Sequence, residues 1–152
     1  MFVAVSKIDL IVYGIYFLYM GLEDIAYDLI KDLIKEFRAS KSDRQKQIEI
    51  ATSLVKKTYM RFNFEWTTEL ESERTEGRFE GQRQILSQYS QLFLNIAVEI
   101  NDVLPKESER MKNIATQMKR GAYGILTHSS NQITPVGNKC AIEVMNYIED
   151  IQ

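Results

Sequence analysis

The sequence is poor in the residues that build the most common reactive and cross-linked sites. It has one cysteine, Cys140, and one histidine, His128. An intrachain disulfide and a zinc cluster of several cysteines are therefore excluded, and so is any site that needs two histidines. Only seven glycines and two prolines occur among the 152 residues, which excludes collagen-like and low-complexity chains. A single cysteine fits a reducing compartment, so we expect the protein in the cytoplasm.

The chain also lacks an excess of charge of either sign. Its 19 Lys and Arg residues against 21 Asp and Glu residues give a net charge of −2. This balance argues against a protein whose whole surface binds nucleic acid. Hydrophobic residues make up 45% of the chain, which is too many for a mostly disordered protein. A chain of this length buries roughly 70% of its unfolded surface, and we expect a single helical domain over residues 1–152.

No apolar run is long enough to cross a membrane. The longest, Leu10 to Leu22, is broken only by Gly14 and Gly21, whereas a spanning helix needs about 20 apolar residues. Asp9 precedes the run and no Ala-x-Ala-like cleavage site follows it, so it is a poor signal peptide. We therefore expect no membrane span, and a helix that is buried inside a domain or an oligomer.

Apolar residues recur at steps of three and four along five segments, which is the period of a helix. The predicted helices cover 6–38, a segment from a Ser42 N-cap to Leu70, 85–104, a segment from Pro105 to Ala122, and a short stretch after a loop over 127–138. Sequence analysis thus predicts an all-α fold. We expect an elongated antiparallel helical bundle of about five helices, with the first two long.

Two segments carry weaker signals. Apolar residues alternate over 60–66, as they do in a strand, but the longer helical pattern through this region favours a helix. Between residues 71 and 84 the one large apolar residue is Phe79. We expect this segment to form a turn or a solvated helical tip.

The N-terminal helix is apolar on more than one face and must be covered on all sides. Tyrosine is common where an apolar interface has wet edges, because its hydroxyl needs a partner. These features predict a partner-binding surface made of Leu10, Tyr13, Tyr16, Phe17 and Met20. We expect a non-enzymatic protein–protein interaction module, acting as a homo-oligomer, an adaptor or a regulatory subunit.

A series of glutamates recurs at helical spacing in the middle of the chain. On one continuous helix each like-charge pair costs roughly 0.2–0.5 kcal/mol, so the row needs neighbouring cations. We expect a solvated face that arginines at 61, 74 and 78 neutralise locally. The row comprises Glu65, Glu69, Glu73, Glu76 and Glu80.

The alternative is a metal-dependent phosphate or nucleotide hydrolase. Mg²⁺ is bound by carboxylates together with waters and substrate phosphates. The pair Glu99-x-x-Asp102 resembles the E-x-x-D element of helical nucleoside triphosphate pyrophosphatases of the MazG type. Residues 72–76, however, lack one acid of that family's E-E-x-x-E element. The candidate ligands of a divalent metal such as Mg²⁺ are Glu69, Glu73, Glu99 and Asp102.

A second alternative is a small helical subunit that binds nucleic acid. A basic stretch lies around the start of the second predicted helix and offers a phosphate-binding patch. The simpler interpretation is that this stretch lies against the acidic residues of 65–80. The candidate nucleic-acid-binding residues are Arg38, Lys41, Arg44 and Lys46.

The sequence favours no nucleophilic catalysis. Cys140 falls on the inward stripe of the last predicted helix, where a free cysteine behaves as a small hydrophobic residue. His128 lies in the polar loop. The phosphate-binding and nucleophile motifs G-x-x-x-x-G-K-[ST], G-x-G-x-x-G and G-x-S-x-G are missing as well.

Overall fold

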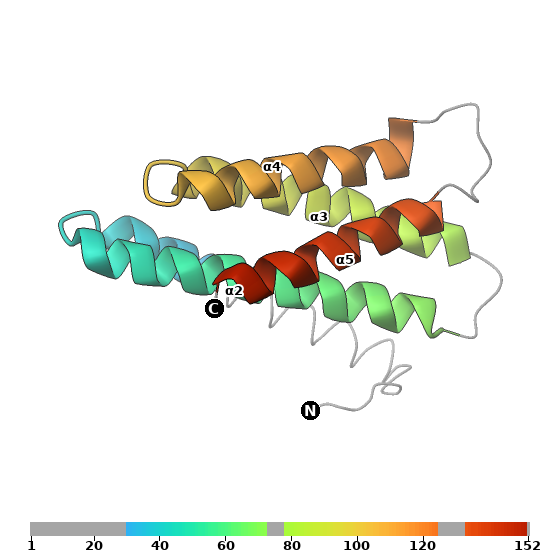
Figure 1. Ribbon diagram of the computed structural model, residues 1–152, viewed down its shortest axis with the longest axis horizontal. Helices are drawn as coiled ribbons and strands as arrows, with labels where there is room; N and C mark the ends of the chain where they lie inside the picture. Colours follow the sequence, from blue (N-terminus) through green and yellow to red (C-terminus); the bar gives the residue numbers. More distant parts are fainter. Residues whose placement is uncertain (1–29, 73–77, 125–132, 152) are drawn as a thin grey trace. The chain divides into compact units, whose positions relative to one another are not determined.

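The computed structural model describes residues 30–72, 78–124 and 133–151 (Figure 1). Within these ranges every regular element is helical and none is a strand. The elements are a helical segment over residues 30–39, α2 (Arg44–Leu70), α3 (Arg78–Ile100), α4 (Pro105–Lys119), the π-helix η2 (Arg120–Gly124) and α5 (Ile133–Ile151). The prediction of an all-α fold is confirmed for the described part of the chain.

The chain divides between Lys41 and Ser42 into two compact units. Of the first unit the structure describes residues 30–41, and the helix over 30–39 agrees with the end of the helix predicted for 6–38. The rest of that helix lies outside the described residues. The second unit, Ser42–Gln152, holds α2 to α5. A single domain over the whole chain stays a prediction.

Helix α2 is 27 residues long and is capped by Asp43, whose side chain accepts the N–H of Lys46 at 3.1 Å. The predicted cap, Ser42, is therefore wrong by one residue, since Ser and Asp are both good caps and stand side by side. The helix continues through residues 60–66, so the helical interpretation of this segment is confirmed. Phe62 and Trp66 are buried there, whereas Met60 and Phe64 are exposed.

Helix α3 begins at Arg78, seven residues before the predicted start at Ile85. Of the two forms expected for 71–84, a turn or a solvated helical tip, the helical one applies to residues 78–84, although one of them is buried. Gln82, which carries no apolar signal, is buried at 1% exposure, and its Oε1 accepts the Thr134 hydroxyl. A hydrogen bond to a neighbouring helix compensates for the burial of this polar side chain.

Helix α5 also begins earlier than predicted. Residues 133–138 were expected in a loop but form its first turns. Pro135 is compatible with this position because the first turn of a helix does not use its backbone N–H groups. Gly137 removes a steric conflict, because a Cβ there would lie 2.0 Å from Cζ2 of Trp66.

Contacts between helix ends fix their directions in the second unit. Arg44 at the start of α2 donates to the carbonyl oxygen of Asp102, just past the end of α3. Trp66 near the end of α2 bonds to Asn138 near the start of α5. The hydroxyl of Ser108 at the start of α4 donates to the carbonyl oxygen of Ala97 near the end of α3. Helix α2 therefore runs opposite to α3 and α5, and α4 runs opposite to α3.

The core of this unit is rich in aromatic side chains from α2 and α3. Phe62 is the centre of the cluster, with ring centroids 5.4 to 6.3 Å from those of Trp66, Tyr89 and Phe93. Tyr89 and Phe93 also meet edge to face. Stacked and edge-to-face pairs of this kind contribute about 0.5–1.5 kcal/mol each beyond the area they bury. Helix α5 adds Cys140, Val144 and Ile148 to the core.

Among the described helices, none combines the length and the apolar character needed to span a membrane.

Candidate functional site

Two members of the acidic row lie in the protein interior. Glu65 and Glu69 are only 5% and 8% exposed, so the expectation of a solvated face is wrong for them. One Glu65 carboxylate oxygen lies 3.1 Å from Nε of Arg61 and accepts the hydroxyl of Tyr89. The expected neutralisation by Arg61 is confirmed. Burial nevertheless raises the pKa of Glu65, while the Arg61 charge and the two hydrogen-bonding groups act in the opposite direction.

This buried polar cluster, Arg61–Glu65–Tyr89, joins α2 to α3. Arg61 also lies over the exposed ring of Phe64, 5.4 Å from its centroid. A buried carboxylate whose hydrogen-bonding partners all come from the protein itself is better suited to fix how two helices pack than to bind a substrate. We interpret the cluster as a structural device.

The residues of the metal hypothesis do not all come together. At about 1.5 Å per residue, α2 extends about 38 Å from Arg44, which contacts Asp102, to Glu69. Glu69 and Asp102 are thus at opposite ends of α2 and do not share one metal ion. Glu99 lies on α3 near the Asp102 end, and Glu73 is outside the described residues. Across the described ranges, no three Asp, Glu, His or Cys side chains form a group that could hold a metal ion.

The basic residues of the nucleic-acid hypothesis fall into both units. Arg38 and Lys41 belong to the first, Arg44 and Lys46 to the second, and all four are exposed. The guanidinium group of Arg44 donates one hydrogen bond to the carbonyl oxygen of Asp102, at 2.8 Å. Nucleic-acid binding through these residues stays a prediction.

The partner-binding surface predicted at the N-terminus lies outside the described residues. This applies to all five of its members, Leu10, Tyr13, Tyr16, Phe17 and Met20.

The outer face of α3 is the feature that the sequence analysis missed. No charged residue occurs from Gln84 to Val98. The exposed side chains of this stretch are amides and aliphatic groups, and Leu94 and Val98 are 42% and 66% exposed. We call these residues the α3 face: Gln84, Gln88, Gln91, Leu94, Asn95 and Val98.

The α3 face differs from the outer faces of the other helices. Helices α2, α4 and α5 present charged residues to solvent, for example Lys57, Glu109 and Glu149. Depletion of charge is the compositional mark of the centre of a protein interface. The missing charges could have been read from the sequence, but their exposure could not, because the same stretch also carries core residues such as Phe93.

Two of the acidic residues near the ends of the α3 face, Glu80 and Asp102, have an arginine close by. Glu80 pairs with Arg83 at 3.0 Å, and the carbonyl of Asp102 accepts a bond from Arg44.

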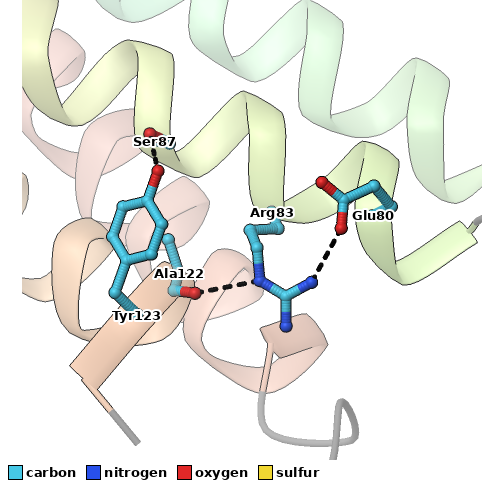
Figure 2. Close-up of polar contacts among 5 residues, drawn as sticks. All are labelled: Glu80, Arg83, Ser87, Ala122 and Tyr123. Atoms are coloured by element: carbon cyan, nitrogen blue, oxygen red, sulfur yellow. Dashed lines mark hydrogen bonds and ion pairs between the residues drawn. The ribbon is translucent and has the colours of Figure 1, made fainter. Parts of the chain in front are cut away.

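Polar contacts anchor the N-terminal half of α3 to η2 (Figure 2). Nε of Arg83 donates to the carbonyl oxygen of Ala122 at 3.0 Å, and the hydroxyls of Ser87 and Tyr123 share a hydrogen bond. A Cβ on Gly121 would lie 2.6 Å from Cγ1 of Val136, so glycine allows η2 to approach α5.

The large exposed apolar residues of α2 and α5 form two small pairs. Met60 and Phe64 lie one turn apart on α2, and Ile142 and Met145 lie together on α5. Unlike the α3 face, both pairs stand among charged neighbours, such as Lys57 and Lys139.

Comparison with known proteins adds no relative. No protein-family model matches the chain, and no curated protein or solved structure is significantly similar to it.

Proposed function

We propose that this chain is a non-enzymatic protein–protein interaction module, an oligomeric adaptor or regulatory subunit built as an elongated antiparallel helical bundle. The observation that carries the proposal is the α3 face, an exposed helix surface without charge from Gln84 to Val98. Water-exposed helix faces normally carry charged residues, and contact surfaces are depleted of them.

A second line of support comes from the N-terminal sequence. Its apolar residues, which include Tyr13 and Phe17, exceed what one face of a helix needs, and an all-round apolar helix has to be covered. The single buried Cys140 fits a reducing compartment, and we place the function in the cytoplasm.

The hydrolase alternative has weaker support. Glu69 and Asp102 lie at opposite ends of α2, so they would have to serve different ions. Glu65, which is more deeply buried than Glu69, already has Arg61 and Tyr89 as partners.

The experiment combines two charged substitutions in the N-terminal apolar surface, Tyr13→Glu and Phe17→Glu. We expect the double variant to lower the molar mass of the full chain in light scattering, while the helical circular dichroism signal stays the same. Light scattering reports association and circular dichroism reports folding, so the two effects are separable. An unchanged mass in a folded variant contradicts the proposed role of this surface.

A further inference from the structure

We propose that the α3 face is the contact surface for a second copy of this chain, arranged around a twofold axis near Gln91. The inference rests on the proposed function and names its partner and geometry. A twofold interface places one surface against itself, so each charge meets a like charge near the axis. The α3 face avoids that repulsion because Gln84 to Val98 carry no charge.

The chemistry of the face is complementary to itself. Each Gln or Asn side chain offers both donors and an acceptor, so identical amides can bond to one another. Gln91 and Asn95 already show this complementarity within one helix, where Nε2 donates to Oδ1 at 2.9 Å. The exposed aliphatic groups of Leu94 and Val98 contribute the apolar area. An acidic or basic partner would find no countercharge here.

We place the twofold axis at the midpoint of the uncharged stretch, because this position keeps the charged residues at either end farthest from the axis. Gln91 is the midpoint of Gln84 and Val98, so the axis brings Gln91 against its own copy and Gln84 against Val98 of the second copy. The two α3 helices then run antiparallel, which places the positive end of each helix dipole beside the negative end of the other. Glu80 approaches the Asp102 region of the second copy; Arg83 pairs with Glu80, and the Arg44 guanidinium lies at the backbone carbonyl of Asp102.

The size of the face indicates how tight the contact is. From Gln84 to Val98 it measures about 21 Å along the helix and about 10 Å across. This projected area of about 200 Å² is well below the roughly 800 Å² per partner of a standard stable interface. We therefore expect a reversible dimer whose population depends on concentration.

The first test is a pair of matched double variants in the full chain. Leu94→Glu with Val98→Glu introduces charge on the α3 face, and Ile142→Glu with Met145→Glu introduces it on α5. The two sets are matched in exposure, at 42% and 66% against 63% and 46%. We expect the α3 variant to raise the dimer dissociation constant at least tenfold in sedimentation equilibrium, and the α5 variant to behave like the unmodified chain.

The second test checks the register by cross-linking. Under a mild oxidant we expect Gln91→Cys to form a disulfide-linked dimer, because facing residues at the axis come within disulfide distance. Gln84→Cys lies on the same face, but the axis separates its two copies by about 21 Å, so we expect no cross-link. The native Cys140 is buried in both variants.

Several results would overturn the inference. One is a wild-type chain that stays monomeric up to about 1 mM, a result that contradicts the oligomeric function as well. A dimer that persists unchanged in the folded Leu94→Glu, Val98→Glu variant contradicts the α3 contact alone. Equal cross-linking of Gln84→Cys and Gln91→Cys, or none in either, contradicts the twofold register.

Discussion

The indole Nε1 of Trp66 donates a hydrogen bond to Oδ1 of Asn138 over 2.9 Å, and the edge of the same ring occupies the space that a side chain at position 137 would need. One residue of α2 is thereby held by two consecutive residues of α5. Because Trp66 is the only tryptophan of the chain, its fluorescence reports directly on this contact. The buried polar cluster and the aromatic core, by contrast, lie between α2 and α3.

Gly137→Ala is expected to destabilise the protein strongly. A Cβ at this position would lie 2.0 Å from Cζ2 of Trp66 and 2.1 Å from Cη2, and a rigid indole ring cannot yield as a flexible side chain can. We expect the free energy of unfolding to fall by about 3 kcal/mol, the upper range for overpacking. Urea denaturation followed by Trp66 fluorescence measures it. Asn146→Ala, on the exposed face of α5, is the control and should change it by less than about 0.5 kcal/mol.

Asn138→Ala is expected to cost about 1–3 kcal/mol, because it leaves the buried indole N–H of Trp66 without its acceptor. Asn138→Asp retains an acceptor oxygen at the same place and should cost less. The same denaturation experiment compares the two variants. Equal free energies of unfolding for the alanine variant and the unmodified protein would show that the hydrogen bond makes no net contribution to stability.

Glu65 makes the stability of the protein depend on pH. Burial raises its pKa above the ordinary value of 4.5, against the opposing effects of Arg61 and Tyr89. Between 4.5 and the raised value the folded state holds a proton that the unfolded chain has lost, so the contribution of Glu65 to stability is complete below this window and decreases as the pH rises through it. Glu65→Gln removes the titrating group.

We therefore expect the stability difference, unmodified protein minus Glu65→Gln, to be constant at low pH and to decline above about pH 4.5. Denaturation curves of both proteins over a series of pH values measure it. A difference that increases with pH would mean that Arg61 and Tyr89 outweigh burial and lower the pKa instead.

Cys140 is expected to be almost unreactive in the folded protein. Burial, with a smaller contribution from Glu143, raises the pKa of its thiol to about 12. Because the thiolate is the reactive form, alkylation at pH 8 should be about a thousandfold slower than in denaturant. Mass spectrometry of iodoacetamide-treated samples measures both rates. Comparable rates would show that α5 opens readily around Cys140.

The fold was largely predictable because the helical period is strong where helices bury apolar residues. Phe62 and Trp66 lie on the predicted stripe of α2, and Cys140 and Val144 lie on that of α5. The helix starts were mispredicted where a polar residue or a glycine, which gives no apolar signal, occupies a buried position. Gln82, in the part of α3 that was not predicted, is buried and bonded to Thr134, and Gly137, in the unpredicted first turns of α5, leaves room for Trp66.

The candidate sites were less predictable, because residue types that can bind metals or substrates, such as glutamate, also occur in the packed interior. Glu65 was expected on a solvated face, yet a partner 24 residues away, Tyr89, makes its burial possible. Spacing along one helix shows neither that partner nor the distance that separates Glu69 from Asp102. Conversely, the α3 face contains no reactive residue that a sequence motif would identify. Its residues alternate along the chain with core residues, and only their exposure in the structure distinguishes the two groups.

The central claim, that this chain acts by associating with other protein chains and first of all with itself, is tested most directly by its molar mass in solution. Size-exclusion chromatography with light scattering over a range of concentrations measures it on the unmodified full chain. The account predicts a mass that rises from the monomer value of 17.7 kDa towards a dimer or larger assembly as concentration increases. A monomer mass at every concentration would contradict it.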